Sequence, residues 1–177
     1  MRSRADLAAI DWFGLNHYSP LYAKADPERP LGFSFGDAPA DAPRTGIGWP
    51  IEPAAFRDTL TAVSRRYRLP IYVLENGFGA EDKPDATGAI VDQPRIDYLQ
   101  AYVAAMGEAI SAGADVRGYF VWSLLDNFEW GSGYRPRFGL VYVDYETQRR
   151  TPKASFRWYA QLIPAPPRPG SSPRPGG

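Results

Sequence analysis

The sequence contains no cysteine and only one histidine, His17, among its 177 residues. Without cysteine the chain can form neither disulfides nor thiolate metal sites. A single histidine also argues against a histidine-rich metal site and against a Ser/His/Asp triad. The chemistry of any active site must therefore come from carboxylates, amides, hydroxyls and aromatic rings.

Net charge and long apolar runs are missing as well. Lys plus Arg and Asp plus Glu each number 20, so the formal net charge is zero and no overall field favours nucleic acid or an anionic membrane. No apolar run is long enough to span a bilayer, and the start, MRSRADLAAI, lacks the apolar segment of a signal peptide. The sequence predicts a soluble, cytoplasmic protein that binds neither nucleic acid nor membrane.

Aromatic residues are abundant: the chain has 5 Trp, 11 Tyr and 9 Phe. Several lie in segments rich in Gly, Pro and Asn, namely "WFGLNHYSP", "GIGWP" and "DNFEWGSGYRPRFG". Aromatic side chains most often fill a core. Rings beside Glu and Asn in loops also suit a sugar site, because the flat C–H faces of a sugar stack on rings and its hydroxyls need acceptors. Both interpretations stay open at this point.

Strand-like and helix-like segments alternate along the chain. This alternation predicts an α/β protein with parallel strands. A long proline-containing loop follows the first strand, and the last residues are too rich in Pro, Gly and Ser to fold. The predicted strands cover 11–16, 71–75 and 116–125, the helices 53–67, 94–112 and 153–163, a hairpin or extended pair 138–152, and the disordered tail 164–177.

Polar and aromatic residues lie at the carboxyl end of each predicted strand. Asn16 and Tyr18 lie at the end of the first, Glu75 closes the second, and the residues from Trp122 to Trp130 lie at the end of the third. The carboxyl ends of parallel strands meet at one edge, where active sites of such folds lie. A buried and unpaired Glu75 would be costly, which favours a functional role for this carboxylate.

The residues alone suggest a pair of carboxylates. Glu75 and Glu129 lie at neighbouring strand ends, so they could act as nucleophile and acid. Asp126 and Asn127 are candidates for the site, but we favour a role in structuring the loop, because short polar side chains bond nearby backbone. Glu52, which opens a helix, is predicted to be a surface charge near its N-terminus.

Three segments resemble glycoside hydrolase family 1, which contains β-glucosidases, β-galactosidases and 6-phospho-β-glycosidases. "IYVLENGFG" resembles the segment that carries the nucleophile, and "FGLNHYSP" resembles the end of the sixth strand, with His17 in place of a tyrosine. "GYFVWSLLDNFEWGSGYRPRFGLVYVDYETQRRTPKASFRWY" resembles the eighth strand, its loop and the final helix. The resemblance implies that 1–163 form the C-terminal part of a TIM (β/α)8 barrel, about three βα units, the sixth to the eighth.

The resemblance also implies roles for individual residues in a retaining mechanism. Glu75 would be the nucleophile, and Tyr18 would contact its carboxylate. Glu129 would then bind sugar hydroxyls instead of acting as the acid. His17 is expected to pack or hydrogen-bond near Tyr18. The implied substrate-binding residues are Asn16, with no fixed partner, Trp49 on the aglycone side, Trp122 under the glycone ring, Glu129, Trp130 as a donor, and Phe138.

Part of the family pattern is absent from the sequence. The acid/base carboxylate of the family lies in an Asn-Glu-Pro segment after the fourth strand, which this chain lacks. Three strands leave two open edges, and inward residues such as Val73 and Phe120 would lack partners. We expect part of a retaining β-glycosidase for β-D-glucosides or related sugars, without metal or organic cofactor. The alternatives are an inactive carbohydrate-binding remnant, or one half of a split enzyme needing an N-terminal half-barrel polypeptide.

Overall fold

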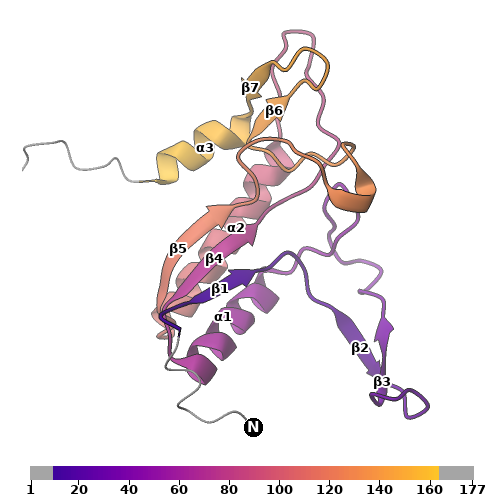
Figure 1. Cartoon of the computed structure of the whole chain (residues 1–177), viewed down its shortest axis with the longest axis vertical. Helices are drawn as coiled ribbons and strands as arrows, with labels where there is room; N and C mark the ends of the chain where they lie inside the picture. The colour runs from indigo at the N-terminus through magenta and orange to yellow at the C-terminus, as the bar shows by residue number, and fades with distance from the viewer. Residues whose placement is uncertain (1–9, 164–177) are drawn as a thin grey trace, which may run out of the picture.

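The computed structural model describes residues 10–163, so the predicted tail 164–177 lies outside the described residues. A parallel sheet forms the centre of this part of the chain (Figure 1). Its strands are β1 (Phe13–Asn16), β4 (Ile71–Asn76) and β5 (Val116–Val121), in the order β1–β4–β5. Both neighbouring pairs are parallel, as the alternation of elements predicts.

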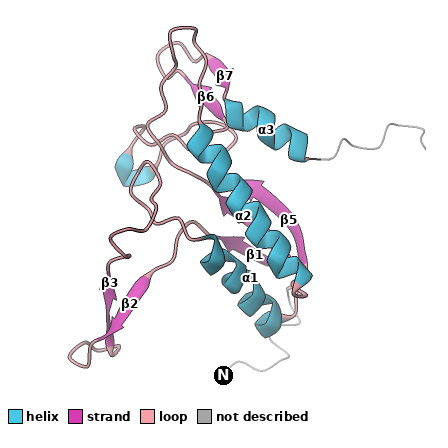
Figure 2. Cartoon of the chain, turned by 180° about the vertical axis from the view of Figure 1, so that it is seen from behind, coloured by secondary structure: helices cyan, strands magenta, loops and turns pink. Residues whose placement is uncertain are grey.

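Two helices cover one face of the sheet. They are α1 (Pro53–Tyr67) and α2 (Gln93–Ser111), which lie in front of the sheet in Figure 2. A proline suits the first turn of α1, where its missing N–H is not needed. Side chains from both helices and from β4 are fully buried between the layers, among them Phe56, Leu60, Ile71, Leu99 and Tyr102. No helix within residues 10–163 is both long and apolar enough to cross a membrane.

The opposite face of the sheet is open. Phe120 is 56% exposed there, and Leu74 is 41% exposed. The prediction that Phe120 lacks a partner is therefore confirmed, but the prediction for Val73 is wrong. Val73 is fully buried in the core beneath the helices. Because side chains alternate along a strand, its neighbour Leu74 faces the open side instead.

A hairpin projects from the body of the molecule (Figure 1). Strands β2 (Tyr22–Ala25) and β3 (Phe33–Gly36) pair antiparallel within the segment predicted to be an irregular loop. Most of their residues are exposed, so no burial pattern marks these strands in the sequence. The Tyr22 hydroxyl donates to Glu52 Oε2 at 2.5 Å. Glu52 lies at the N-terminus of α1, as predicted, but it is half-buried and anchors the hairpin there, so the prediction of a free surface charge is wrong.

The C-terminal elements fold over one edge of the sheet. Strands β6 (Val141–Val143) and β7 (Arg150–Pro152) form the predicted antiparallel pair, and α3 (Ala154–Leu162) is the predicted final helix. Strand β5 ends four residues before its predicted end at 125. The Trp122 N–H still donates to the Asn76 carbonyl, but the Ser123 N–H donates to the Phe138 carbonyl. The chain leaves the sheet between these two residues, whose peptide bond is cis.

Candidate active site

Glu75 lies near the carboxyl end of β4, the central strand. The parallel pairing of β1 and β4 places Asn16 beside Glu75, and their Cα atoms are register partners. The Tyr18 hydroxyl, two residues after β1, donates to Glu75 Oε2 at 2.8 Å. Burial, together with this hydrogen bond and the charge of Glu75, raises the pKa of Tyr18. Tyr18 therefore remains a protonated donor to the carboxylate across the ordinary pH range.

Two glycines after Glu75 let the neighbouring loops approach β4. A Cβ on Gly77 would overlap the carbonyl oxygen of Trp122. A Cβ on Gly79 would lie 2.7 Å from the ring of Phe138. The motif "ENGFG" thus needs glycine at both positions because the loop after β5 packs directly against it.

Trp122 and Glu129 face each other in the loop after β5. The indole Nε1 of Trp122 donates to Glu129 Oε1 at 3.1 Å. Burial raises the pKa of Glu129, and the charge of Glu75 adds to this rise, whereas the Trp122 hydrogen bond opposes it. The effect of the Glu75 charge on the pKa of Glu129 indicates that the two carboxylates are near enough to interact.

Aromatic rings form a wall beside Glu75. Tyr18 packs edge-on against Trp49 and Phe138, with ring centroids 5.4 and 6.0 Å apart. Trp49 and Phe138 are 5.8 Å apart. Phe138 is almost fully buried, whereas Trp49 is 39% exposed. The wall therefore presents an accessible indole next to a carboxylate, which is the combination that suits a sugar or an aglycone ring.

Two further predicted site residues are exposed. Asn16 is the register partner of Glu75 in the sheet, which places it beside the site as expected, and it is exposed. Trp130 is 81% exposed in the short 3-10 helix η2 (Trp130–Ser132), directly after Glu129. The structure thus brings together Tyr18, Glu75 and the aromatic wall, and it leaves Trp130 at the surface.

His17 packs as expected near Tyr18. Its ring lies 5.1 Å from that of Phe56, centroid to centroid, on the helix side of the sheet. Its Nδ1 is buried and has no hydrogen-bond partner among residues 10–163. Burial lowers the pKa of His17. The imidazole therefore fills the core and does not face the open side of the site.

Asp126 and Asn127 structure the loop after β5. Asp126 is buried and accepts the backbone N–H groups of Gly139 and Val143. Asn127 Nδ2 donates to the Ser123 hydroxyl at 3.0 Å. These contacts favour the interpretation that we preferred from the sequence, in which both residues hold the loop and not the substrate.

A series of connected, mostly buried ion pairs lies next to the site, and the sequence analysis did not predict it. Lys153 Nζ lies 2.5 Å from Asp82 and 2.9 Å from Asp126, while Arg95 binds Asp82 at 2.7 Å. Asp92 and Arg137 extend the series at its two ends, to Arg95 and Asp126 respectively. We call these six residues the ion network. It ties the loop after β4 to the loop after β5, and thereby fixes the two loops that flank the site.

Pairs in the ion network lie far apart in sequence. Asp82 and Lys153 are separated by 71 residues, and Asp82 and Arg95 by 13. Local periodicity cannot connect such positions. One feature of the sequence could have revealed the ion network: Arg95 and Lys153 lie at the starts of α2 and α3, where the helix dipole disfavours positive charge. Both cations occur there because they bind buried carboxylates.

The comparisons with known proteins agree with this geometry. The family model for glycosyl hydrolase family 1 matches residues 4–166. The chain belongs to this family. It is 46% identical over 155 residues to beta-glucosidase A of Thermotoga maritima, covering 87% of this chain and 34% of that protein. It is 43% identical over 170 residues to a bifunctional beta-D-glucosidase/beta-D-fucosidase of Bifidobacterium breve, covering 87% of this chain and 37% of that protein.

Solved structures give the same result. The family 1 β-glucosidase structure from Thermotoga maritima matches with a TM-score of 0.81 and 45% identity, over 86% of this chain and 34% of that chain. A complex of the Thermotoga enzyme with deoxynojirimycin matches equally well, with the same TM-score, identity and coverage. The chain thus spans about a third of the length of these relatives, and its sheet and helices form part of the family barrel.

Proposed function

We propose that this chain is the C-terminal portion of a retaining β-glycosidase, contributing the sixth to eighth βα units, with Glu75 as the nucleophile. The observation that carries the proposal is the hydrogen bond from Tyr18 to one oxygen of Glu75. It orients the carboxylate and leaves the other oxygen to attack the anomeric carbon of a β-glycoside. The expected intermediate is a covalent glycosyl-enzyme, as in retaining glycosidases.

The rest of the site would bind the sugar. Trp122 would stack under the glycone ring, and Glu129, held by the Trp122 indole, would accept hydrogen bonds from its hydroxyls. Trp49 would line the aglycone side, and Phe138, which contacts Trp49, would pack near the glycone. Asn16 would bind beside Glu75. Trp130, which is 81% exposed, would donate its indole N–H to another sugar hydroxyl.

The substrate class follows from the relatives and from the Glu129–Trp130 pair. The Thermotoga relative is named a β-glucosidase and the Bifidobacterium relative a β-D-glucosidase/β-D-fucosidase. We propose β-D-glucosides or closely related sugars. A carboxylate at position 129 suits hydroxyls, whereas a sugar phosphate would need cations and hydroxyl donors. The proposed reaction needs no cofactor, and the proposed location is the cytoplasm.

Full turnover would need a second carboxyl group. Retaining enzymes place it about 5–5.5 Å from the nucleophile. We propose that it comes from an Asn-Glu-Pro segment on an N-terminal half-barrel polypeptide, which makes this chain one part of a split active site. The second candidate function is carbohydrate binding without turnover. The accessible indole of Trp49 beside the site favours it, because stacking needs no acid.

Covalent trapping tests the nucleophile without the missing acid. The chain is incubated with a 2-fluoro glucoside that carries a highly activated leaving group, and its intact mass is measured. Glu75 attacks the anomeric carbon as the bond to the leaving group breaks, and the leaving group departs with the electron pair. The fluorine slows hydrolysis of the ester, so an adduct is expected to accumulate.

Two carboxylate variants make this test specific. Glu75→Gln should form no adduct, whereas Glu146→Gln, which changes an exposed carboxylate away from the site, should react like the unmodified chain. Peptide mapping that places the adduct on Glu129 would overturn the nucleophile assignment. If a chain that is monomeric, and folded by its near-UV circular dichroism, forms no adduct, the chain alone does not catalyse the first step. The function would then be sugar binding, or catalysis only after assembly with a second polypeptide.

A further inference from the structure

Strand β4 contains a bulge just before its end. Its register against β1 skips one residue between Val73 and Glu75, and its register against β5 shifts between Val73 and Asn76. The extra residue shifts the alternation of side chains by one position. As a result Glu75 is directed away from the helix layer, whereas Asn76 enters that layer and is fully buried.

The side chain of Asn76 binds three elements at once. Its Nδ2 donates to the His17 carbonyl, just after β1, at 2.8 Å and to the Tyr98 hydroxyl of α2 at 3.0 Å. Its Oδ1 accepts from the Tyr119 hydroxyl of β5 at 2.6 Å. Both amide protons and the amide oxygen are thus used within the protein, as a fully buried polar group requires. Asn76 therefore joins both neighbours of the central strand to the helix layer.

The same contacts reach the hydrogen bond between Tyr18 and Glu75. His17, whose carbonyl Asn76 holds, directly precedes Tyr18, and Asn76 directly follows Glu75. The Tyr18 hydroxyl donates to the Glu75 carboxylate. Two peptide bonds and two hydrogen bonds therefore close a ring through these four residues. A shift of the Asn76 amide would move the backbone on both sides of the contact.

Helix α2 holds the backbone of Tyr18 as well. The hydroxyls of Tyr98 and Tyr102 both donate to the Tyr18 carbonyl, each at 3.2 Å. Their rings are stacked, with centroids 4.1 Å apart. Burial raises the pKa of Tyr98 and of Tyr102, so both hydroxyls remain protonated donors. Tyr98 thus links the Asn76 amide to the main chain that carries Tyr18.

We propose that Asn76 is a positioning residue for the nucleophile. Its amide holds the β4 bulge so that Glu75 faces the site and Tyr18 reaches its carboxylate. Asn76→Leu would leave the His17 carbonyl and the Tyr119 hydroxyl without partners, and Asn76→Asp, when ionised, would offer the His17 carbonyl only acceptors. The catalytic part of this role rests on the proposed function of Glu75, whereas the contacts do not.

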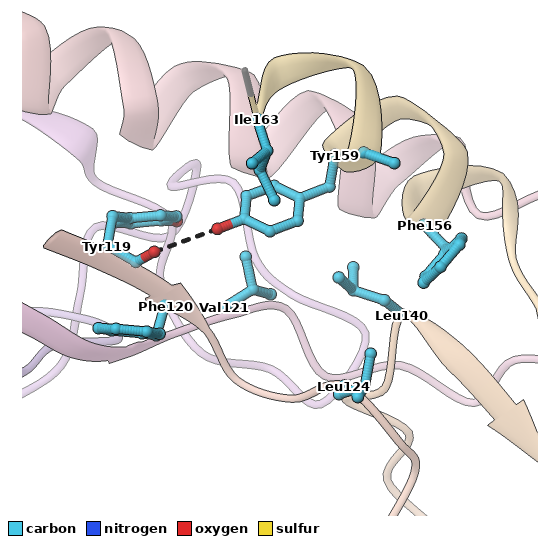
Figure 3. Close-up of a pocket in the computed structure, with 9 residues that line it drawn as sticks. Tyr119, Phe120, Val121, Leu124, Leu140, Phe156, Tyr159 and Ile163 are labelled. Atoms are coloured by element: carbon cyan, nitrogen blue, oxygen red, sulfur yellow. Dashed lines mark hydrogen bonds between the residues drawn. The ribbon is translucent and has the colours of Figure 1, made fainter. Parts of the chain in front are cut away.

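A matched pair of tyrosine substitutions tests this role. Tyr119→Phe removes the hydroxyl that binds Asn76 Oδ1. Tyr159→Phe is the control, because that hydroxyl donates to the Tyr119 carbonyl at 3.1 Å, shown as the dashed line in Figure 3, and both rings line the same apolar pocket. We expect Tyr119→Phe to lower the first-order rate constant for trapping by the 2-fluoro glucoside about three- to tenfold, and Tyr159→Phe to change it less than about twofold. A purely structural role would reduce the amount of adduct through the folded fraction and leave the rate constant unchanged.

Asn76→Asp supplies a rescue that depends on pH. Burial and the neighbouring charge of Glu75 favour the protonated form of the introduced carboxyl group. In that form it can donate to the His17 carbonyl, as the amide does. The rate constant relative to the unmodified chain should be near one at about pH 5 and fall about tenfold or more by about pH 8. Measuring both chains in the same buffers removes the pH dependence that they share.

A second measurement does not depend on reactivity. The side-chain carboxyl carbon of Glu75 is observed by NMR after carbon-13 labelling of glutamate, and it is assigned with Glu75→Gln. Tyr18→Phe defines its chemical shift without the hydrogen bond. Tyr119→Phe and ionised Asn76→Asp should move the resonance toward that position, and Tyr159→Phe should not.

Either of two results would overturn the proposal. The first is a Glu75 resonance that stays at its unmodified position in folded Tyr119→Phe and Asn76→Asp chains. The second is a trapping rate constant that is the same in Tyr119→Phe as in Tyr159→Phe. If the unmodified chain forms no adduct, the assignment of Glu75 as nucleophile fails, and the resonance alone decides whether Asn76 positions its carboxylate.

Discussion

The loop end of the sheet and the outer edge of β5 differ in how their polar groups are satisfied. At the loop end, buried Asp126 accepts from two backbone N–H groups, from Lys153 and from Arg137. At the β5 edge, the Tyr119 carbonyl accepts from a side chain where a strand could pair, and Phe120 is 56% exposed. The first region is completed by contacts within this chain, whereas within residues 10–163 no strand pairs with the outer side of β5.

This difference separates two requirements of a barrel enzyme. The position of Glu75 relative to Tyr18 and the aromatic wall depends on groups that are all present here. Closure of the barrel around them depends on the two sheet edges. The contacts that hold Glu75, the proposed nucleophile, therefore do not depend on what pairs with those edges.

The largest effect is expected from the ion network. Lys153→Met leaves Asp82 and Asp126 buried without their shared cation, so the free energy of unfolding should fall by about 3–5 kcal/mol. Urea denaturation followed by near-UV circular dichroism measures the loss. Arg117→Met, which breaks an exposed pair with Asp115, is the control and should change little. Equal effects of the two variants would mean that the ion network does not hold the loop end together.

The stability lost on truncating one phenylalanine in each region compares the two regions directly. Phe138→Ala removes a ring that is 2% exposed and packed in the aromatic wall, and should cost about 3 kcal/mol. Phe120→Ala removes a ring that is 56% exposed on the open face, and should cost less than about 1 kcal/mol. The same denaturation experiment measures both. If Phe120→Ala were the more damaging change, the open face would already be covered in the free chain.

Within the site, we expect the next effect from Tyr18→Phe. The change removes a hydrogen bond to a charged group while keeping the ring. Because such a bond is worth about 1.5–3 kcal/mol, the rate of trapping by the 2-fluoro glucoside should fall about ten- to a hundredfold. Tyr134→Phe, at an exposed ring, serves as the control. An unchanged rate in Tyr18→Phe would show that the carboxylate needs no orienting donor.

The smallest effect is expected from acidification. Burial lowers the pKa of His17 below its ordinary 6.5 in the folded chain, so the unfolded chain binds more protons just below that pH. The free energy of unfolding should therefore fall as the pH drops below about 6.5, and this contribution should level off below the folded pKa. His17→Phe should remove it, and the chain has no other histidine. Parallel stability curves for both chains between pH 7.5 and 5 would contradict the prediction.

The sequence predicted well those features that are local. Helical spacing and Pro53 placed α1, the apolar run placed β4, and alternation placed the three parallel strands. The segments that resemble the family predicted the contact between Tyr18 and Glu75, although the two residues are 57 positions apart. The predictions that succeeded therefore rest either on local patterns or on continuous family motifs.

Predictions failed where the outcome depended on distant or exposed groups. Val73 and Leu74 are both apolar, so composition could not decide which one faces the helices. The β2–β3 hairpin has mostly exposed residues and leaves no periodic pattern. Glu52 looked free because its partner, Tyr22, lies 30 residues earlier. The ion network could not be predicted for the same reason, because Asp82 and Lys153 are 71 residues apart and meet only in the folded chain.

The central place of β4 in the sheet has a consequence for how the molecule opens. Strand β4 is hydrogen-bonded on both sides, whereas β1 and β5 each have one outer side that no strand pairs within residues 10–163. Amides of outer strands exchange with solvent through smaller, local openings, and those of a central strand only through larger ones. When an outer strand frays, Tyr18 will be released with β1 and Trp122 with β5, the strands that precede them, while Glu75 stays on β4, which opens last.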